Sequence, residues 1–600
     1  MRRRAARPGP EACLRTPRVH LVGRIAACAC FVLASCFAPA RPREMSWPVP
    51  QGGAVVSEHP LATQAGIRVL EQGGNAADAA VATAFALAVV LPRAGNLGGG
   101  GFALHADHDG DALFLDFRET APLAARPEAY LDAQGRFVPE RGARGPTAVG
   151  VPGSPAGLHA LWSAAGSGRF TFAQLVEPAI LLARAGFPVD ADLARDLASS
   201  SNFDKFNAAA RAVYAPGGKP LLEGERLAQP DLARTLERLA ARGPAEFYSG
   251  ETRELVRAEL ARTPCAAPEK GGCVAPDGRD WLAPADFESY RVERREPLVG
   301  WHRGFEILTA PPPSAGGFVL LHVLGVLEGF APPSATPDAS WWHRFLEATR
   351  SAYAERARHF GDPAGGVPVD QLLAPARLAA RRVAIGPRAD PALEATPLAP
   401  LEGQETTHIC VLDAAGGAVS LTTTLNSSFG SGILVGGAGF LLNDELDDFT
   451  LAAGSVNGYG LAGSDKNTIR SGRRPLSSMT PTIVRQGGNA NTLVVGAPGG
   501  PRIPVAVLQV LVRALECGLP LEDAIAAPRL HQQHSPSHSL FEQGFDPALL
   551  EELRATFGHE LKPAAGHLAL VGAIHLDAPG AKPSAAHDPR RTGLGATTKR

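Results

Sequence analysis

The sequence predicts an α+β fold, a four-layer αββα sandwich in which two sheets stack and helices cover both outer faces. Several segments alternate apolar and polar residues and are joined by short turns, which is typical of paired strands. Longer Ala- and Leu-rich stretches with helical periodicity come before and after these pairs. Strand pairs with helices on both sides favour this layered arrangement, because every apolar face then finds a partner.

The first half of the chain is mainly helical. Residues 60–91 predict two helices broken at Gly73 and Gly74, because paired glycines favour a turn. Residues 102–106 and 112–117 predict strands around an Asp-Gly turn. Other elements predicted here are helices over most of 152–262, a strand at 305–310, and helices at 317–328 and 341–359.

The second half begins with a hairpin. Residues 407–413 and 418–425 predict its two strands, since threonine and branched residues favour strands. Residues 387–405, which precede it, are Pro-rich and polar, and we expect them to be exposed and flexible. A second hairpin at 481–497 and helices at 504–517 and 547–557 complete the prediction.

Composition excludes some classes of protein. The chain has 600 residues and a net charge of −2, so nothing indicates a nucleic-acid partner. No apolar run reaches the roughly 18–20 residues of a membrane-spanning helix.

No metal or phosphate motif is present. His531, His534 and His538 lack metal-binding spacing, and we expect a surface loop there. The four glycines at 98–101 lack the Lys-Ser/Thr of a phosphate loop and precede a strand, which favours close backbone packing.

The N-terminus predicts export. An Arg-rich region is followed by a short apolar stretch at 25–37, as in a signal peptide. Residues 33–36 resemble a bacterial lipobox, in which Cys36 is lipidated and attaches the protein to a membrane. The alternative is an ordinary signal peptide cut near Ala38 or Ala40. We therefore expect a lipoprotein signal over 1–35, a linker over 36–50, and a periplasmic or cell-envelope location.

Two of the eight cysteines flank a Pro/Gly-rich insert. Cys265 and Cys273 could pair in an oxidising compartment, and free thiols in a surface loop are the alternative. We expect Cys410 to be buried in its strand.

Thr406 is positioned for self-cleavage chemistry. If the bond after Glu405 breaks, Thr406 gains a free α-amine beside its hydroxyl, so nucleophile and base share one residue. An α-amine titrates at about pKa 7.7–8.0, which suits a general base near neutral pH. The alternative for these residues is an ordinary strand hairpin.

Seven motifs occur in the order found in one family. From about residue 52 onward the chain resembles the γ-glutamyltranspeptidases, which are N-terminal-nucleophile hydrolases. The motifs lie at residues 94–102, 116–122, 311–317, 406–408, 443–449, 474–479 and 496–500.

The resemblance implies two subunits cut from one precursor, which jointly form the αββα sandwich. The large subunit is expected at 51–405 and the small, catalytic subunit at 406–600. Thr406 is implied as the nucleophile and Thr424 as the hydroxyl that orients it. Gly499 and Gly500 are implied to form the oxyanion hole, where glycine permits a sharp turn and close approach to the substrate.

The resemblance also implies a site for a γ-glutamyl group. Arg118 provides a bidentate fork for the α-carboxylate. The hydroxyls of Ser477 and Ser478 are implied to donate to the same carboxylate. The implied acceptors for the α-ammonium are Asn426, Glu445 and Asp448, and Tyr459 lies in an implied lid over the pocket.

The acidic residues at 444–448 have a plainer interpretation. They could form a solvated loop or a calcium loop, although the spacing of an EF-hand is absent.

The implied activity is that of a γ-glutamyltransferase and glutathione hydrolase. Thr406 would attack a γ-glutamyl amide and form an ester, which water or the amine of an amino acid or dipeptide resolves. No cofactor is implied. Two alternatives remain: a glutaryl amidase resembling the cephalosporin acylases, and a catalytically dead surface lipoprotein that acts as a binding module.

Overall fold

A seven-stranded sheet has the hairpin of β9 and β10 at its centre. The computed structural model describes residues 49–270, 280–390, 406–452, 454–455, 457–458, 461, 464–487 and 490–599. The strands, in sheet order, are β18 (Leu594–Thr597), β1 (Ala54–Ser57), β9 (Thr406–Leu412), β10 (Ala418–Thr424), β2 (Gly100–Ala106), β3 (Ala112–Asp116) and β6 (Glu293–Arg295). The pairs β18–β1, β1–β9, β9–β10, β10–β2, β2–β3 and β3–β6 are all antiparallel.

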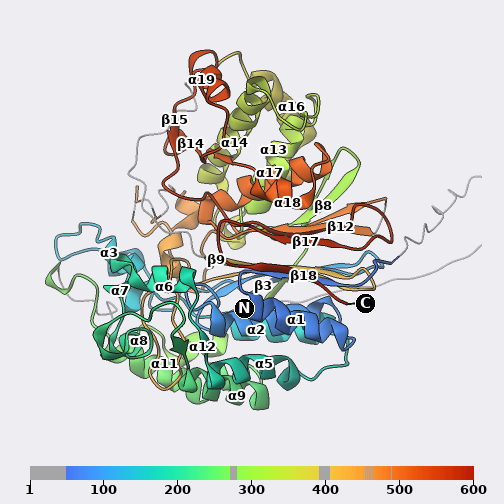
Figure 1. Ribbon diagram of the computed structural model, residues 1–600. Helices are drawn as coiled ribbons and strands as arrows, with labels where there is room; N and C mark the ends of the chain where they lie inside the picture. Colours follow the sequence, from blue (N-terminus) through green and yellow to red (C-terminus); the bar gives the residue numbers. More distant parts are fainter. Residues whose placement is uncertain are drawn as a thin grey trace, which may run out of the picture. The chain divides into compact units, whose positions relative to one another are not determined.

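A six-stranded sheet lies beside the first one (Figure 1). Its strands, in order, are β17 (Ser584–His587), β16 (Gly572–His575), β12 (Ala490–Gly496), β11 (Thr482–Gln486), β8 (Phe305–Thr309) and β7 (Leu298–His302). Three short strands form a further small sheet: β13 (Leu530–His531), β14 (Ser539–Phe541) and β15 (Leu561–Pro563).

Both faces of the larger sheet are buried, and alternate residues of its strands serve two different cores. In β9, Ile409 and Val411 join a core with the helices on one side. Cys410 and Leu412 point the other way, into a core shared with the smaller sheet. The period of two along the strand therefore connects two apolar layers through a single sheet.

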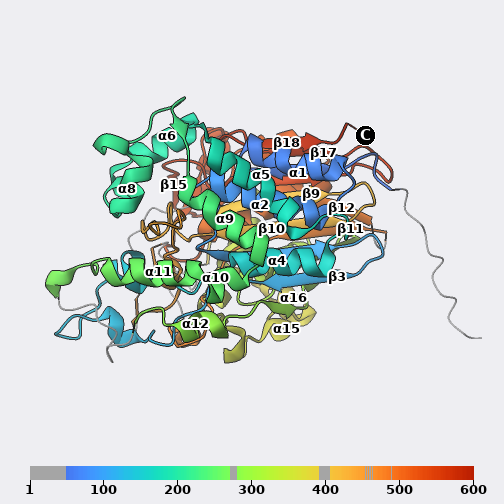
Figure 2. The ribbon, with the colours of Figure 1, turned by 90° about the horizontal axis from the view of Figure 1, so that it is seen from below.

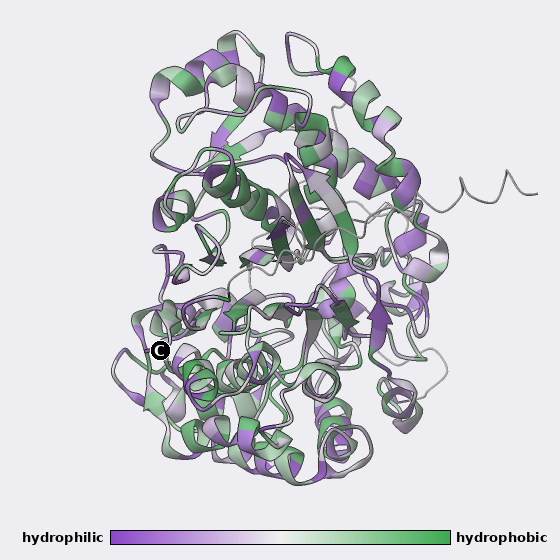
Figure 3. Ribbon diagram, turned by 90° about the vertical axis from the view of Figure 1, so that its right-hand side faces the viewer, coloured by the Kyte–Doolittle hydropathy of each residue, from purple (hydrophilic) through white to green (hydrophobic). Residues whose placement is uncertain are grey.

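Helices cover the outer face of each sheet. Those packed on the larger sheet include α1 (Pro60–Glu71), α2 (Ala76–Val90), α4 (Ser154–Ala165), α5 (Phe172–Ala185) and α9 (Pro230–Arg242), seen in front of the strands in Figure 2. Those beside the smaller sheet include α13 (Gly316–Leu327), α14 (Ala339–His359), α16 (Pro375–Ala384), α17 (Ile503–Leu515), α18 (Leu521–Ala526) and α19 (Pro547–Ala555). In Figure 3, green marks hydrophobic residues, and it is found on central strands and on helices beside them.

Helix α2 lies wholly inside the core between the larger sheet and the outer helices. All of its residues are buried, as expected for a helix that is apolar all round. It begins at Asn75, whose side chain accepts from the N–H of Asp78 while the Asp78 carboxylate accepts from the N–H of Asn75. This capping box satisfies two backbone donors at the start of the helix.

The mixed helix-and-sheet class is confirmed, together with both predicted hairpins and the helix break near Gly73. Several short strands were not predicted, namely β1, β6, β7, β16, β17 and β18. Each has only three to five residues, which is too short for a clear alternation pattern.

Two further expectations can be compared with the structure. Cys410 is buried, as expected, and Cys265 is disulfide-bonded. Its suggested partner Cys273 lies outside the described residues. The prediction of a surface loop at His531 was wrong, because this residue lies on β13 and is buried; burial lowers the pKa of His531 to about 3.

Within the described part of the chain, no helix combines the length and apolar character required to cross a bilayer.

The glycines at the start of β2 permit a close approach to β10. A Cβ on Gly99 would lie 2.0 Å from the carbonyl oxygen of Thr424, and one on Gly101 would lie 2.2 Å from that of Thr422. The obstructing atoms belong to the backbone of a central strand, so they cannot move aside cheaply. Close packing is therefore the role of this segment in the fold.

Gly101→Ala is expected to destabilise the protein by about 1–3 kcal/mol, the usual cost of forcing an extra methyl into a packed core. Thermal unfolding would show this as a lower Tm. Gly566→Ala is the matched control, because a Cβ there meets no atom within 4 Å. Equal Tm values for the two variants would contradict the packing argument.

Candidate active site

Thr406 is the first residue of β9, and the strand register places Thr424 of β10 directly opposite it. The Thr406 hydroxyl donates to the hydroxyl oxygen of Thr424 over 3.3 Å. The same oxygen accepts from the backbone N–H of Asn426 at 2.8 Å. Both threonines are buried, so this pair has a defined geometry at the end of a central strand.

Asn96 holds the end of β10 in place. Its Nδ2 donates to the Thr424 carbonyl at 2.9 Å and to the Thr423 hydroxyl at 3.1 Å. Its Oδ1 accepts from Ser154 Oγ at 2.7 Å and from the N–H of Gly99. The Gly-rich motif was recognised in the sequence, but this supporting role of Asn96 and Ser154 was not.

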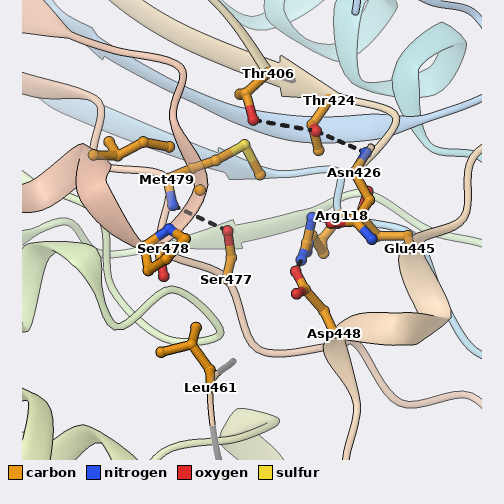
Figure 4. A pocket seen from close by; sticks show the side chains of 13 residues that line it. Arg118, Thr406, Thr424, Asn426, Glu445, Asp448, Leu461, Ser477, Ser478 and Met479 are labelled. Carbon is orange, nitrogen blue, oxygen red and sulfur yellow. Dashed lines mark hydrogen bonds and ion pairs between the residues drawn. The ribbon is translucent and has the colours of Figure 1, made fainter. Parts of the chain in front are cut away.

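A pocket of about 310 Å³ opens beside Thr406 (Figure 4). It collects nine of the residues singled out from the sequence, and its other walls are mainly apolar. The lining residues are Arg118, Thr406, Thr424, Asn426, Glu445, Asp448, Leu461, Ser477, Ser478, Met479, Gly500, Pro501 and Ile503. Segments more than 380 residues apart in sequence, from Arg118 to Ile503, therefore meet at one cavity.

Arg118 forms the charged centre of the pocket. Its Nη1 pairs with Glu445, and its Nη2 lies 2.6 Å from Asp448 Oδ2. The resemblance implies that Arg118 holds the carboxylate of a ligand head group and that the two acidic residues hold its ammonium; in the structure both acidic residues also contact Arg118. The pocket thus presents a cation and two carboxylates side by side, a complement to the zwitterionic head of an α-amino acid.

Burial dominates the titration of this cluster. It raises the pKa of Glu445 well above its usual value, against the opposing effect of Arg118. Glu119, 3.8 Å from Arg118, is fully buried, and neither of its carboxylate oxygens has a hydrogen bond partner among the described residues. Burial raises the pKa of Glu119 to about 7, although Arg118 works to lower it. Glu119 was not recognised from the sequence as a residue of the site.

The hydroxyls of Ser477 and Ser478 can donate hydrogen bonds to a ligand in the pocket. Ser477 Oγ accepts from the N–H of Met479 at 3.1 Å. Ser478 Oγ accepts from Arg356 at 3.5 Å. A hydroxyl that accepts on its protein side keeps its own hydrogen for another partner, so both suit an anionic ligand group.

The segment with these serines is held by the loop at 311–317. The Ser477 N–H donates to Pro313, and the N–H of Ala315 donates back to the Ser477 carbonyl, both at 2.9 Å. Ser314 Oγ donates to the Met479 carbonyl at 2.7 Å. This accounts for a motif whose role could not be predicted from the sequence.

Gly499 and Gly500 turn the chain sharply after β12. Gly499 has φ +137° and Gly500 has φ +57°, values that L side chains rarely adopt. Only Gly500 is among the pocket-lining residues. In the described part of the structure, the N–H groups of both glycines donate to no protein acceptor.

The acidic segment at 444–448 is largely buried, so the alternative of a solvated loop is wrong. Asp448 Oδ1 accepts from Asn457 at 2.8 Å, and Asp447 accepts from the N–H of Gly458 at 2.7 Å. These bonds fasten the following segment beside the pocket. Tyr459, Glu405 and Cys36 lie outside the described residues.

Among the residues that the structure describes, no three His, Cys, Asp or Glu side chains gather as a metal site.

Comparison with known proteins defines the family. The sequence model of the gamma-glutamyltranspeptidase family matches residues 62–598. The glutathione hydrolase proenzyme of Pseudomonas sp. strain A14 is 40% identical over 560 residues, covering 91% of this chain and 94% of that protein. The chain therefore belongs to the γ-glutamyltranspeptidase family.

Two solved structures are also similar to this chain. Cephalosporin acylase from Bacillus halodurans superposes with a TM-score of 0.77 at 25% identity, covering 94% of this chain and 98% of that one. The γ-glutamyltranspeptidase of Helicobacter pylori gives a TM-score of 0.52 at 38% identity, covering 57% of this chain and 94% of that one.

His408 lies two residues beyond Thr406, buried between the two sheets. Its Nδ1 is 2.8 Å from Thr422 Oγ1, and a Cβ on Gly496 would lie 2.2 Å from the ring. Burial lowers the pKa of His408 from 6.5 to about 3. Its imidazole is therefore neutral at physiological pH.

Acidification should destabilise the protein through His408. Between pH 6.5 and about 3 the unfolded chain binds a proton that the folded state excludes, so stability falls as pH falls. The slope from this residue is at most about 1.4 kcal/mol per pH unit. Denaturant unfolding from pH 7 to 5 should show a shallower slope for His408→Asn than for the wild type. His108→Asn, on an exposed turn, is the control; equal slopes in all three proteins would refute the assignment.

Proposed function

We propose that this protein is a γ-glutamyltransferase and glutathione hydrolase that matures by cutting itself before Thr406. The observation that carries the proposal is the pocket. It has a hydrogen-bonded Thr406–Thr424 pair on one wall and a complement to an α-amino acid head group on another. A γ-glutamyl amide has that head group at one end and its scissile carbonyl at the other.

The chemistry follows from the groups present. After the cut, the α-amine of Thr406 accepts the proton of its hydroxyl as the oxygen attacks the γ-carbonyl carbon. The N–H groups of Gly499 and Gly500 stabilise the oxyanion. The C–N bond breaks, the amine returns the proton to the leaving nitrogen, and a γ-glutamyl ester remains. Water or an amino acid or peptide amine then attacks the ester and releases Thr406.

The head group is held by opposite charges. The α-carboxylate receives hydrogen bonds from Arg118, Ser477 and Ser478. The α-ammonium donates to Asn426, Glu445 and Asp448, the last two of which also contact Arg118. The family resemblance implies a lid that includes Tyr459, a residue outside the described part of the chain.

The fold proposed for the mature enzyme is the four-layer αββα sandwich of the N-terminal-nucleophile hydrolases, shared by the two chains 51–405 and 406–600. The sheet pairing supports this division, because β9 and β10 lie between β1 and β2 of the other chain. A chain cut before Thr406 would stay assembled through those strand pairs.

A mass spectrum of the purified protein tests maturation. Two chains are expected, the second beginning at Thr406 and ending at Arg600. Thr406→Ala is expected to remain a single inactive chain, since it lacks the attacking oxygen. Two normal fragments from that variant would exclude the mechanism, and an uncut, inactive wild type would favour the binding-module alternative.

The same spectrum tests the proposed lipid anchor in the periplasm or cell envelope. The expected mass is that of the large subunit with its linker, residues 36–405, with a lipidated Cys36 as the first residue. A mature N-terminus beyond Cys36 would contradict the anchor.

Donor selectivity separates this function from a glutaryl acylase. A glutaryl amide has the same acyl length but no ammonium. Asp448→Ala should lower kcat/KM for γ-glutamyl-p-nitroanilide at least about tenfold, since losing one partner of a buried charge costs more than 1.4 kcal/mol. It should lower kcat/KM for the glutaryl analogue much less.

Two further variants complete that experiment. Arg118→Lys keeps the charge but loses the fork, so both donors should suffer because both contain a carboxylate near that site. Asp465→Ala, at an exposed position in the same part of the chain, is the control. A wild type that prefers the glutaryl amide would establish the acylase alternative.

A further inference from the structure

Asn426 occupies an unusual backbone conformation. Its φ is +77°, a region that non-glycine residues seldom adopt, although asparagine tolerates it better than most. Such a conformation persists when the surrounding structure enforces it. For a pocket-lining residue, the contacts that enforce it are part of the site.

Asp444 provides most of those contacts. Its backbone carbonyl accepts from Asn426 Nδ2 at 3.0 Å. Its carboxylate accepts from the N–H of Ser427 at 3.0 Å and from the Ser427 hydroxyl. An ammonium group only donates hydrogen bonds, so the amide oxygen of Asn426 is the side-chain atom that can accept from it, while the amide nitrogen donates to Asp444.

Lys205, which is distant in sequence, contacts the same turn at 427–428. It lies between α7 (Ser200–Phe203) and α8 (Ala208–Tyr214). Its Nζ donates to the Ser428 carbonyl and lies 3.5 Å from Ser427 Oγ. A Cβ on Gly432 would lie 2.3 Å from the Lys205 carbonyl oxygen, so the two segments are tightly packed.

The charges of this cluster are mutually dependent. Burial raises the pKa of Asp444, and Lys205 works to lower it. Burial lowers the pKa of Lys205 to about 8, with Asp444 opposing that shift and Arg144 adding to it. Neither Lys205 nor Asp444 lines the pocket, so neither contacts a ligand there directly. Hydrogen bonds connect both of them to residues 426–428, of which Asn426 lines the pocket.

We propose that Lys205 is a positioning residue for the donor's ammonium group. It compensates the Asp444 carboxylate and fixes the turn at 426–428, so that Asn426 presents its amide oxygen to the ammonium. The inference rests on the proposed function and adds a residue more than 200 positions before the catalytic threonine.

The test uses matured enzyme and ligands that differ only in the ammonium. Lys205→Met removes the charge, Lys205→Arg retains it, and Ser427→Ala removes the hydroxyl that links Lys205 to Asp444. Lys219→Met is the matched control, because Lys219 is exposed on the same segment. The readouts are KM and kcat for γ-glutamyl-p-nitroanilide and the inhibition constants of L-glutamate and glutarate.

Lys205→Met and Ser427→Ala should raise both KM and the inhibition constant of L-glutamate about tenfold, the scale of one lost hydrogen bond to a charged group. Values of kcat and of the glutarate inhibition constant should stay close to those of Lys219→Met. Lys205→Arg should recover most of the loss.

If the inhibition constants of L-glutamate and glutarate rise by the same factor, the pocket as a whole is disturbed, and this result would overturn the assignment. Unchanged constants would overturn it as well. If Lys205→Met does not mature, Ser427→Ala decides the question alone. A wild type that does not cleave the γ-glutamyl amide would instead refute the proposed function.

Discussion

The in-register pairing of β9 with β10 is the interaction on which the other features of the site depend. It places the hydroxyls of Thr406 and Thr424 opposite each other, and β10 in turn pairs its end with the glycines at the start of β2. A slip of one residue would turn each side chain to the opposite face of the sheet. Two different apolar cores on the two faces of β9 make such a slip costly, so the cores fix the position of the Thr406 hydroxyl.

Burying the charged groups of the pocket lowers the stability of the fold. Arg118 and the carboxyl groups of Glu119, Glu445 and Asp448 are withdrawn almost completely from water, and all three carboxyl groups share the guanidinium of Arg118. Burial raises the pKa values of Glu119 and Glu445, the carboxylate of Asp448 adds to the rise, and Arg118 opposes it. A ligand ammonium would add positive charge where it is lacking, which is why such a cluster is more characteristic of a binding site than of a stabilising ion pair.

The sequence predicted the elements with strong local signals. The two hairpins and the long helices have clear periodicities, and the pocket residues belong to motifs with a recognisable order. The short strands near the C-terminus could not be predicted, because their pairing depends on distant partners such as β1 and β12. The same limit applies to the direct pairing of Arg118 with Glu445 and Asp448, and to Lys205, which reaches Ser427 and Ser428 only through tertiary packing. His531 was misjudged because its polar neighbours concealed the burial of β13.

The edge pairing of β18 with β1 has a consequence for chain topology. The N–H of Gly53 donates to the Thr598 hydroxyl at 3.0 Å, and the N–H of Thr598 donates to the Gly53 carbonyl at 2.9 Å. Residues 53 and 598 are thus neighbours in space, and a short linker suffices to join them. Circular permutation at Thr406 would then make this threonine the residue that follows the initiator methionine. Methionine aminopeptidase, rather than the proposed self-cleavage, would free its α-amine, and the production of the proposed nucleophile would be separated from its use.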